Sequence, residues 1–109
     1  MTQPVAGPRF ADTIPYDTPE SLEDLEGPTG GVVEVGHHID TSPRPSYDLA
    51  DPAQEWSLYS RVVRDGLVRD QVRLLNRDRL VRLWAQLLLP ARCRAVWEAK
   101  FPDLASRTA

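Results

Sequence analysis

The chain has 109 residues, a formal net charge of −3 and one cysteine, and 41% of its residues are hydrophobic. This length permits one domain at most, and the lone Cys93 excludes an internal disulfide framework and suits a reducing compartment. No apolar run approaches the roughly 20 residues of a membrane helix, and the first ten residues lack the charged-then-apolar order of a signal peptide. We therefore expect a cytoplasmic protein without a membrane partner.

Charge and proline content change sharply at about residue 48. Residues 1–48 hold nine acidic and two basic side chains, a net of −7, whereas residues 49–109 hold seven acidic and eleven basic ones, a net of +4. Seven of the ten prolines and five of the six glycines also lie in the first part. Such a composition disfavours a packed core. We therefore expect a disordered acidic arm and linker over residues 1–46, a helical domain over 47–104 and a tail over 105–109.

Residues 1–30 contain five prolines, each of which removes a backbone donor and disfavours helix at the preceding position. One exception is a turn that Thr18 can cap, which would bring Leu22 and Leu25 to one face. Acidic residues with spaced leucines are also typical of segments that fold on a partner. An arm of charge −7 tethered to a helical unit of charge +4 can fold back onto the basic surface or bind a basic cleft of another chain.

The only strand-like stretch lies in residues 31–40, where Val32–Val35 is rich in β-branched residues and is bounded by glycines. A single strand is not stable alone, so this segment either adds to the sheet edge of another protein or forms a loop. Residues 41–48 contain Pro43 and Pro45, and we expect them to form a stiff, extended linker.

A helical period begins at residue 49. Asp51 is a strong N-cap residue, Pro52 suits the first helical position, and Gly66 suits the C′ position just after a helix. Between them, apolar side chains recur three and four residues apart and form one stripe, made of Trp56, Tyr59, Val62 and Val63. The spacing predicts an amphipathic first helix that ends before Gly66.

Three shorter helices are expected to follow, over about 67–75, 77–88 and 91–101, with Asn76 stopping the second or capping the third. Pro90 breaks the third helix, and Pro102 ends the fourth. Large aromatics bury the most area per residue, so the three tryptophans and Phe101 are expected to fill most of the core. The predicted fold is all-α, a small bundle of about four short helices with a disordered acidic N-terminal arm.

No group of residues spells out a reaction. His37 and His38 are adjacent, so in an extended chain they point to opposite sides and chelate one ion poorly, and no Cys/His cluster completes a metal site. We expect them to be a solvated pair. Cys93 lies on an apolar stripe, where buried cysteines are usually inert. We therefore expect no catalytic, metal-binding or cofactor-binding residue, no small-molecule substrate and no enzyme activity.

The arginines are the candidates for binding. Arg77, Arg79 and Arg82 fall largely on the outward side of the third helix, and residues 68–84 have the outline of a helix-turn-helix with its turn at Asn76. These side chains can neutralise DNA phosphates, bind an acidic protein partner, or form a solvated, salt-bridged face. The modest charge of +4 and the aspartates mixed among the arginines favour the last two interpretations over DNA.

The run from Tyr47 to Leu104 carries Asp-Pro before the first helix, a Tyr-x₂-Val-x₃-Gly pattern, a Leu-x₃-Trp pair, a Leu-Pro break and Arg-x₂-Trp-Glu. The residues are Asp51, Pro52, Tyr59, Val62 or Val63, Gly66, Leu80, Trp84, Leu89, Pro90, Arg94, Trp97 and Glu98. In these features the run resembles short helical actinobacterial proteins encoded ahead of nucleotidyltransferase-like toxins in two-gene toxin–antitoxin or abortive-infection systems. It departs from the commoner family pattern after Gly66. The family has acidic residues at the two positions where this chain has Leu67 and Val68.

The resemblance implies an antitoxin-like protein that neutralises a toxin encoded by the adjacent gene through direct contact, and that can also repress its own operon. By residue type, the best candidates for partner contacts are then Trp56, Tyr59, Arg77, Arg79 and Arg82. The leading alternative is a DNA-binding transcriptional regulator that uses residues 68–84, and a third is an accessory protein of a mobile element.

Overall fold

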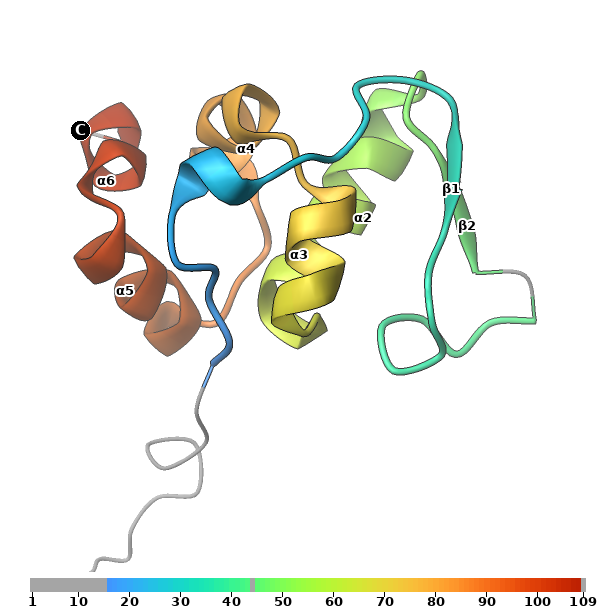
Figure 1. Ribbon diagram of the computed structural model, residues 1–109, viewed down its shortest axis with the longest axis horizontal. Helices are drawn as coiled ribbons and strands as arrows, with labels where there is room; N and C mark the ends of the chain where they lie inside the picture. The colour runs from blue at the N-terminus through green and yellow to red at the C-terminus, as the bar shows by residue number, and fades with distance from the viewer. Residues whose placement is uncertain (1–15, 44, 109) are drawn as a thin grey trace, which may run out of the picture.

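The computed structural model describes residues 16–43 and 45–108 and shows a mostly helical molecule, 54% helix, with a small two-stranded sheet at one end (Figure 1). The fold is therefore not strictly all-α as predicted. In chain order the elements are a 3₁₀ turn η1 (Leu22–Asp24), β1 (Val32–Glu34), β2 (Ser46–Asp48), α2 (Pro52–Asp65), α3 (Val68–Leu74), α4 (Arg77–Leu83), a 3₁₀ turn η2 (Trp84–Gln86), α5 (Ala91–Lys100) and α6 (Pro102–Thr108).

Helix α2 begins as predicted, because the Asp51 side chain accepts a hydrogen bond from the Ala53 N–H at 3.0 Å and Pro52 occupies the first turn. Its end is also as predicted, because α2 stops at Asp65, just before Gly66. Gly66 has φ −77°, however, so it does not adopt the left-handed conformation that is common just after a helix. Glycine is needed here for space instead, because a Cβ atom would lie 2.6 Å from the carbonyl oxygen of Val62.

The turn between α3 and α4 confirms the capping role predicted for Asn76. Its side chain accepts a hydrogen bond from the Arg79 N–H at 3.1 Å, and its own N–H donates to the Tyr59 hydroxyl at 2.9 Å. Helix α4 is shorter than the predicted 77–88, because it ends at Leu83 and continues only as the 3₁₀ turn η2.

The core is built around two of the three tryptophans. Trp84 and Trp97 are fully buried with ring centroids 5.9 Å apart, and Phe101 extends the cluster with its ring centroid 5.7 Å from that of Trp97. The third tryptophan, Trp56, is only partly buried and packs at the margin of the core. The predicted aromatic core is thus confirmed for three of its four members.

Pro102 ends one helix and begins another. It follows Phe101, the C-cap of α5, and stands first in α6, a helix that the sequence interpretation missed by assigning residues 105–109 to a tail. Proline is well tolerated at a first helical position, and Leu104 on the new helix is fully buried. Four predicted helices therefore become five in the part of the chain that the structure describes.

Residues 16–43 are packed, which corrects the predicted disorder for this part of the arm. Leu22, Leu25, Val35 and Ile39 belong to the core. The backbone after η1 runs along α3. The Glu26 N–H donates to the Val72 carbonyl at 2.8 Å, and the Gly27 N–H donates to the Leu75 carbonyl at 2.8 Å. The predicted disorder of residues 1–15 and of residue 44 lies outside the described residues.

The strand-like stretch finds its partner inside the chain. Strand β1 pairs antiparallel with β2 in the register Val32–Asp48, Val33–Tyr47 and Glu34–Ser46. Residues 46–48, expected to be linker, therefore supply the second strand. Tyr47 is buried on the side of the sheet that packs against α2 and donates a hydrogen bond to Asp40. Burial and this hydrogen bond raise the pKa of Tyr47 to about 12.

Candidate partner-binding surface

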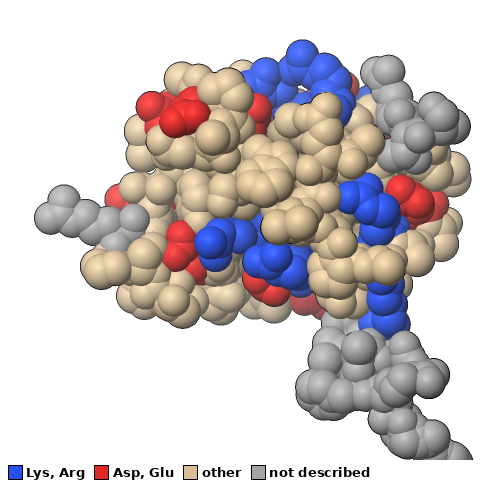
Figure 2. Space-filling model, turned by 180° about the vertical axis from the view of Figure 1, so that it is seen from behind, with Lys and Arg blue, Asp and Glu red and all other residues tan. Residues whose placement is uncertain are grey.

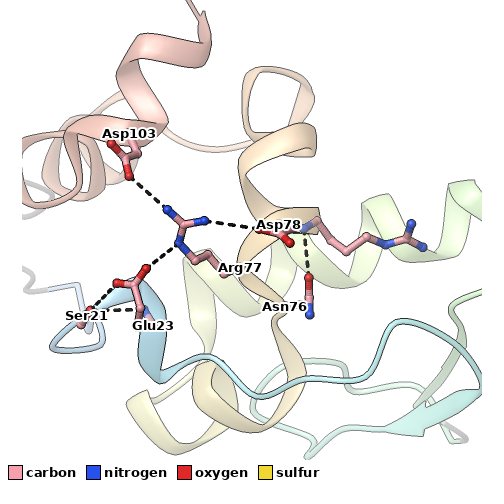
Figure 3. Close-up of polar contacts among 7 residues, drawn as sticks. Ser21, Glu23, Asn76, Arg77, Asp78 and Asp103 are labelled. Atoms are coloured by element: carbon pink, nitrogen blue, oxygen red, sulfur yellow. Dashed lines mark hydrogen bonds and ion pairs between the residues drawn. The ribbon is translucent and has the colours of Figure 1, made fainter.

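Arg77, at the first position of α4, is held by three carboxylates of its own chain (Figure 3). Its guanidinium lies 2.8 Å from Glu23, 3.3 Å from Asp78 and 3.3 Å from Asp103. Glu23 comes from η1 and Asp103 from the first turn of α6, so one arginine joins three separate segments. The acidic segment has folded back onto this part of the basic surface, one of the two outcomes the charge pattern suggested.

Arg79 is also paired within the chain. Its Nε atom lies 2.7 Å from Glu55 of α2, and the Glu55 side chain is only 9% exposed. Arg82 is exposed and forms no ion pair with any residue in the described ranges. Arg79 and Arg82 line a hollow of about 190 Å³ together with Glu55 and Leu83. Of the three arginines predicted to bind a partner, two are thus neutralised internally.

Tyr59, also predicted to contact a partner, is a core residue. It is fully buried, and its hydroxyl accepts the Asn76 N–H that begins α4. Burial raises the pKa of Tyr59 to about 12. The side chain therefore links α2 to the N-cap of α4 and is not available at the surface.

Trp56 does reach the surface, beside the exposed Leu88, which the sequence analysis did not single out. Its indole N–H donates to the Gln86 carbonyl at 2.6 Å. Leu88 is 64% exposed, and its N–H donates to the Ser60 hydroxyl at 3.0 Å, which ties the chain after η2 to α2. The side chains that line a shallow hollow of about 140 Å³ here, which we name the α2–Leu88 surface, are Trp56, Ser57, Ser60, Arg61, Arg64 and Leu88.

The two arginines of the α2–Leu88 surface are less engaged than those of α4. Arg61 donates to the Ser57 hydroxyl at a long 3.5 Å and forms no ion pair with a described carboxylate. Arg64 pairs at 3.1 Å with its sequence neighbour Asp65, and both side chains are about one-third exposed. Such exposed pairs contribute about 0–1 kcal/mol. These guanidiniums therefore remain available to an outside group.

Helix α2 lies behind α3 in the view of Figure 1, on the side of the molecule that Figure 2 presents. On that side, lysine and arginine side chains lie around a central area of uncharged side chains (Figure 2). The α2–Leu88 surface combines the same two properties. It is apolar at Trp56 and Leu88 and basic at its two arginines. A surface with both properties is suited to hold a partner group that is itself partly apolar and partly charged.

The histidine pair is divided between two environments. His38 lies 2.7 Å from Asp70, a nearly buried carboxylate that also accepts the Leu67 N–H at 2.9 Å, so His38 is not simply solvated as predicted. Burial acts to raise the pKa of Asp70, but these hydrogen bonds outweigh it and hold the pKa below its usual value. No group of three or more His, Cys, Asp or Glu side chains within the described ranges could hold a metal ion.

Cys93 is fully buried, and its thiol donates weakly to the Val63 carbonyl at 3.9 Å. Burial raises the pKa of Cys93 to about 11, which keeps the thiol protonated near neutral pH. The prediction that this cysteine belongs to the apolar core is confirmed.

No protein-family model matches this chain, and no curated protein and no solved structure is detectably similar to it. Across residues 16–43 and 45–108, no helix combines the length and apolar character needed to cross a bilayer.

Proposed function

We propose that the protein is a non-enzymatic protein-interaction module that binds a partner protein directly through the α2–Leu88 surface. The observation that carries this proposal is the exposure of Leu88 beside Trp56, with two arginines in the same hollow. Tryptophan and arginine are the residue types most enriched among the side chains that dominate binding energy at interfaces. Leu88 is 64% exposed, whereas Leu87, next to it, is 4% exposed and packs in the core.

We further propose that the partner is a nucleotidyltransferase-like toxin encoded by the adjacent gene, which makes this chain antitoxin-like. This part of the proposal is supported by the resemblance of the run from Tyr47 to Leu104 to proteins of that kind. Enzymes that hold nucleotides often present basic clefts, and exposed acidic side chains of η1, such as Asp24, are available to such a cleft. A partner would also stabilise a chain whose core is small.

The alternative is a DNA-binding regulator that uses α3 and α4. Exposed Arg82 and Arg69 favour it, but Arg77 and Arg79 are already paired with carboxylates and would have to leave them to reach phosphates. A regulator predicts duplex binding that weakens steeply with rising salt and weakens further when Arg82 is replaced by alanine.

Co-expression with the adjacent gene product tests the proposal. A tagged full-length chain should retain that product through gel filtration, and Leu88→Ser should lower the retained amount because it removes the exposed apolar contact. Val32→Ser is the matched control, since Val32 is 67% exposed but lies on β1, outside the α2–Leu88 surface. Failure of the unmodified chain to retain the product, or equal loss with both variants, would contradict the proposal.

A further inference from the structure

We propose that the α2–Leu88 surface takes an acidic partner segment that inserts one apolar side chain against Trp56 and Leu88. This inference rests on the proposed function and names the chemistry of the partner at that same surface. It follows from two independent properties of the surface, its positive charge, which the chain pairs only weakly, and its exposed apolar centre.

The arginines of the molecule differ in how far carboxylates of the chain neutralise them. The chain supplies Glu23, Asp78 and Asp103 to Arg77, and Glu55 to Arg79, but it supplies no described carboxylate to Arg61 within ion-pair distance. Arg61 and Arg64 are three residues apart on α2 and therefore project from the same side of the helix. Two guanidiniums placed in this way match carboxylates spaced along one partner segment, since arginine favours bidentate contact with a carboxylate.

Two acidic groups of this chain lie close enough to modify that charge. Asp65 pairs with Arg64, and Asp40 lies near enough to Arg61 for its carboxylate to be stabilised by it. Asp40 is already satisfied by the Ser42 hydroxyl and N–H and by the Tyr47 hydroxyl. Neither carboxylate lies within ion-pair distance of Arg61, so its guanidinium can still donate hydrogen bonds to a partner's carboxylate.

The apolar side chains of the hollow, Trp56 and Leu88, are held in place by hydrogen bonds within the chain. Ser60 holds the backbone of Leu88 at 3.0 Å, and Gln86 fixes the Trp56 indole at 2.6 Å, so both apolar groups are positioned before a partner arrives. The hollow of about 140 Å³ is smaller than the roughly 300 Å³ at which small-molecule sites begin. It has the scale of a pocket for a single side chain, which is how interface anchors bind.

Duplex DNA fits this surface less well. A phosphate backbone would bring charge against Trp56 and Leu88, whose apolar groups offer it no hydrogen bond. An acidic protein segment satisfies the arginines and covers the leucine at once. DNA therefore enters the test as a competing ligand with its own expected result.

The experiment titrates ¹⁵N-labelled full-length protein with three defined peptides, each of five residues, and follows the indole N–H resonance of Trp56 by NMR. Trp56→Phe identifies that resonance among the three indoles. The first peptide has leucine flanked by glutamates, the second has serine in place of leucine, and the third has lysines in place of the glutamates. We expect the first peptide to shift the resonance, the second to bind about fivefold more weakly, and the third to leave it unchanged.

Variants of the two arginines complete the test. Arg61→Gln combined with Arg64→Gln should weaken the first peptide about tenfold, whereas the corresponding double lysine variant should weaken it less, because lysine keeps the charge but not the bidentate contact. Unchanged dispersion of the remaining amide resonances shows that the variants are folded. The inference is overturned if the lysine peptide shifts Trp56 as strongly as the glutamate peptide, if the shifts map to α4, or if a short DNA duplex shifts Trp56 while the glutamate peptide does not.

The experiments distinguish failure of this inference from failure of the proposed function. Peptide binding without retention of the adjacent gene product would remove the antitoxin proposal and leave the acidic-segment inference standing. Retention of that product by the double glutamine variant, with the same yield as the unmodified chain, would remove the inference and leave the proposed function standing.

Discussion

Helices α2 and α4 both carry arginines, but the chain treats them differently. Arg77 and Arg79 of α4 are neutralised by carboxylates from η1, α6 and α2, whereas Arg61 of α2 has no ion pair with a described residue. The difference shows that arginines predicted to share a helix face do not by themselves identify a binding surface. Whether such a face binds a partner depends on which of its charges the rest of the fold has already used, and here carboxylates of η1, α2 and α6 neutralise Arg77 and Arg79 of α4.

The largest effect is expected from blocking the contact of the acidic segment with α3. A Cβ atom on Gly27 would lie 2.3 Å from the carbonyl carbon of Leu74, so Gly27→Ala should destabilise the fold by about 3 kcal/mol through overpacking against backbone. Gly30→Ala is the matched control, because a Cβ there meets nothing within 4 Å. Urea denaturation measures both; equal stabilities for the two variants would show that residues 16–27 do not dock as described.

A smaller effect is expected from separating Arg79 from its partner. Glu55→Ala leaves the partly buried Arg79 guanidinium without its carboxylate, and we expect a loss of about 2 kcal/mol in the free energy of unfolding. Glu55→Gln keeps an oxygen acceptor in place and should cost less. Thermal melts compare the two variants, and an alanine variant as stable as the unmodified chain would argue against the ion pair.

The comparison between the two helices is sharpened by a pair of single variants. Arg77→Ala removes three ion pairs and should cost about 1 kcal/mol, a modest figure because the side chain is 38% exposed. Arg61→Ala should change stability by less than about 0.5 kcal/mol, since surface changes away from such contacts are usually small. If Arg61→Ala proved the more damaging of the two, the assignment of Arg77 to structure and Arg61 to binding would be reversed.

The smallest effect is expected from acid. Hydrogen bonds from the Ser42 hydroxyl, and then from Tyr47, hold the pKa of Asp40 well below its usual range. A carboxyl with a lowered folded-state pKa adds stability that is complete above its unfolded pKa of about 3.9 and is lost as pH falls below it. Stability of the unmodified chain should therefore fall faster between about pH 4 and pH 2 than that of Asp40→Asn. If the free energy of unfolding falls equally with pH in the two proteins, Asp40 does not contribute to stability in this way.

The helical half of the fold could be predicted because its signals are local. Asp51, Pro52 and Asn76 act through side chains within three residues, and the apolar stripe of α2 follows from spacing alone. The packing of residues 16–43 could not be predicted in this way. Leu22, Leu25, Val35 and Ile39 are few among many polar residues, and they become buried only because they pack into one core with residues distant in the sequence.

The candidate site was predicted in part. Trp56 was selected by residue type and does lie at the surface. Tyr59 was selected on the same ground but is a core residue. Both belong to the apolar stripe of α2, and spacing alone does not tell which of its members lie at the margin of the core. Leu88 was missed because helix 77–88 was expected to continue. Pro90 was a signal for its exposure, because proline biases the backbone before it toward an extended conformation. In extended backbone, successive side chains point to opposite sides, so a buried Leu87 leaves Leu88 facing outward.

The most direct test of the account is the rate at which phenylglyoxal modifies each arginine of the folded, full-length protein, followed by peptide mass spectrometry. The account predicts that Arg61 reacts well before Arg77, and that Gly27→Ala speeds the reaction of Arg77 because the Glu23 carboxylate is withdrawn from it. Equal rates for Arg61 and Arg77 in the unmodified protein would contradict the claim that the chain neutralises Arg77 and leaves Arg61 for a partner.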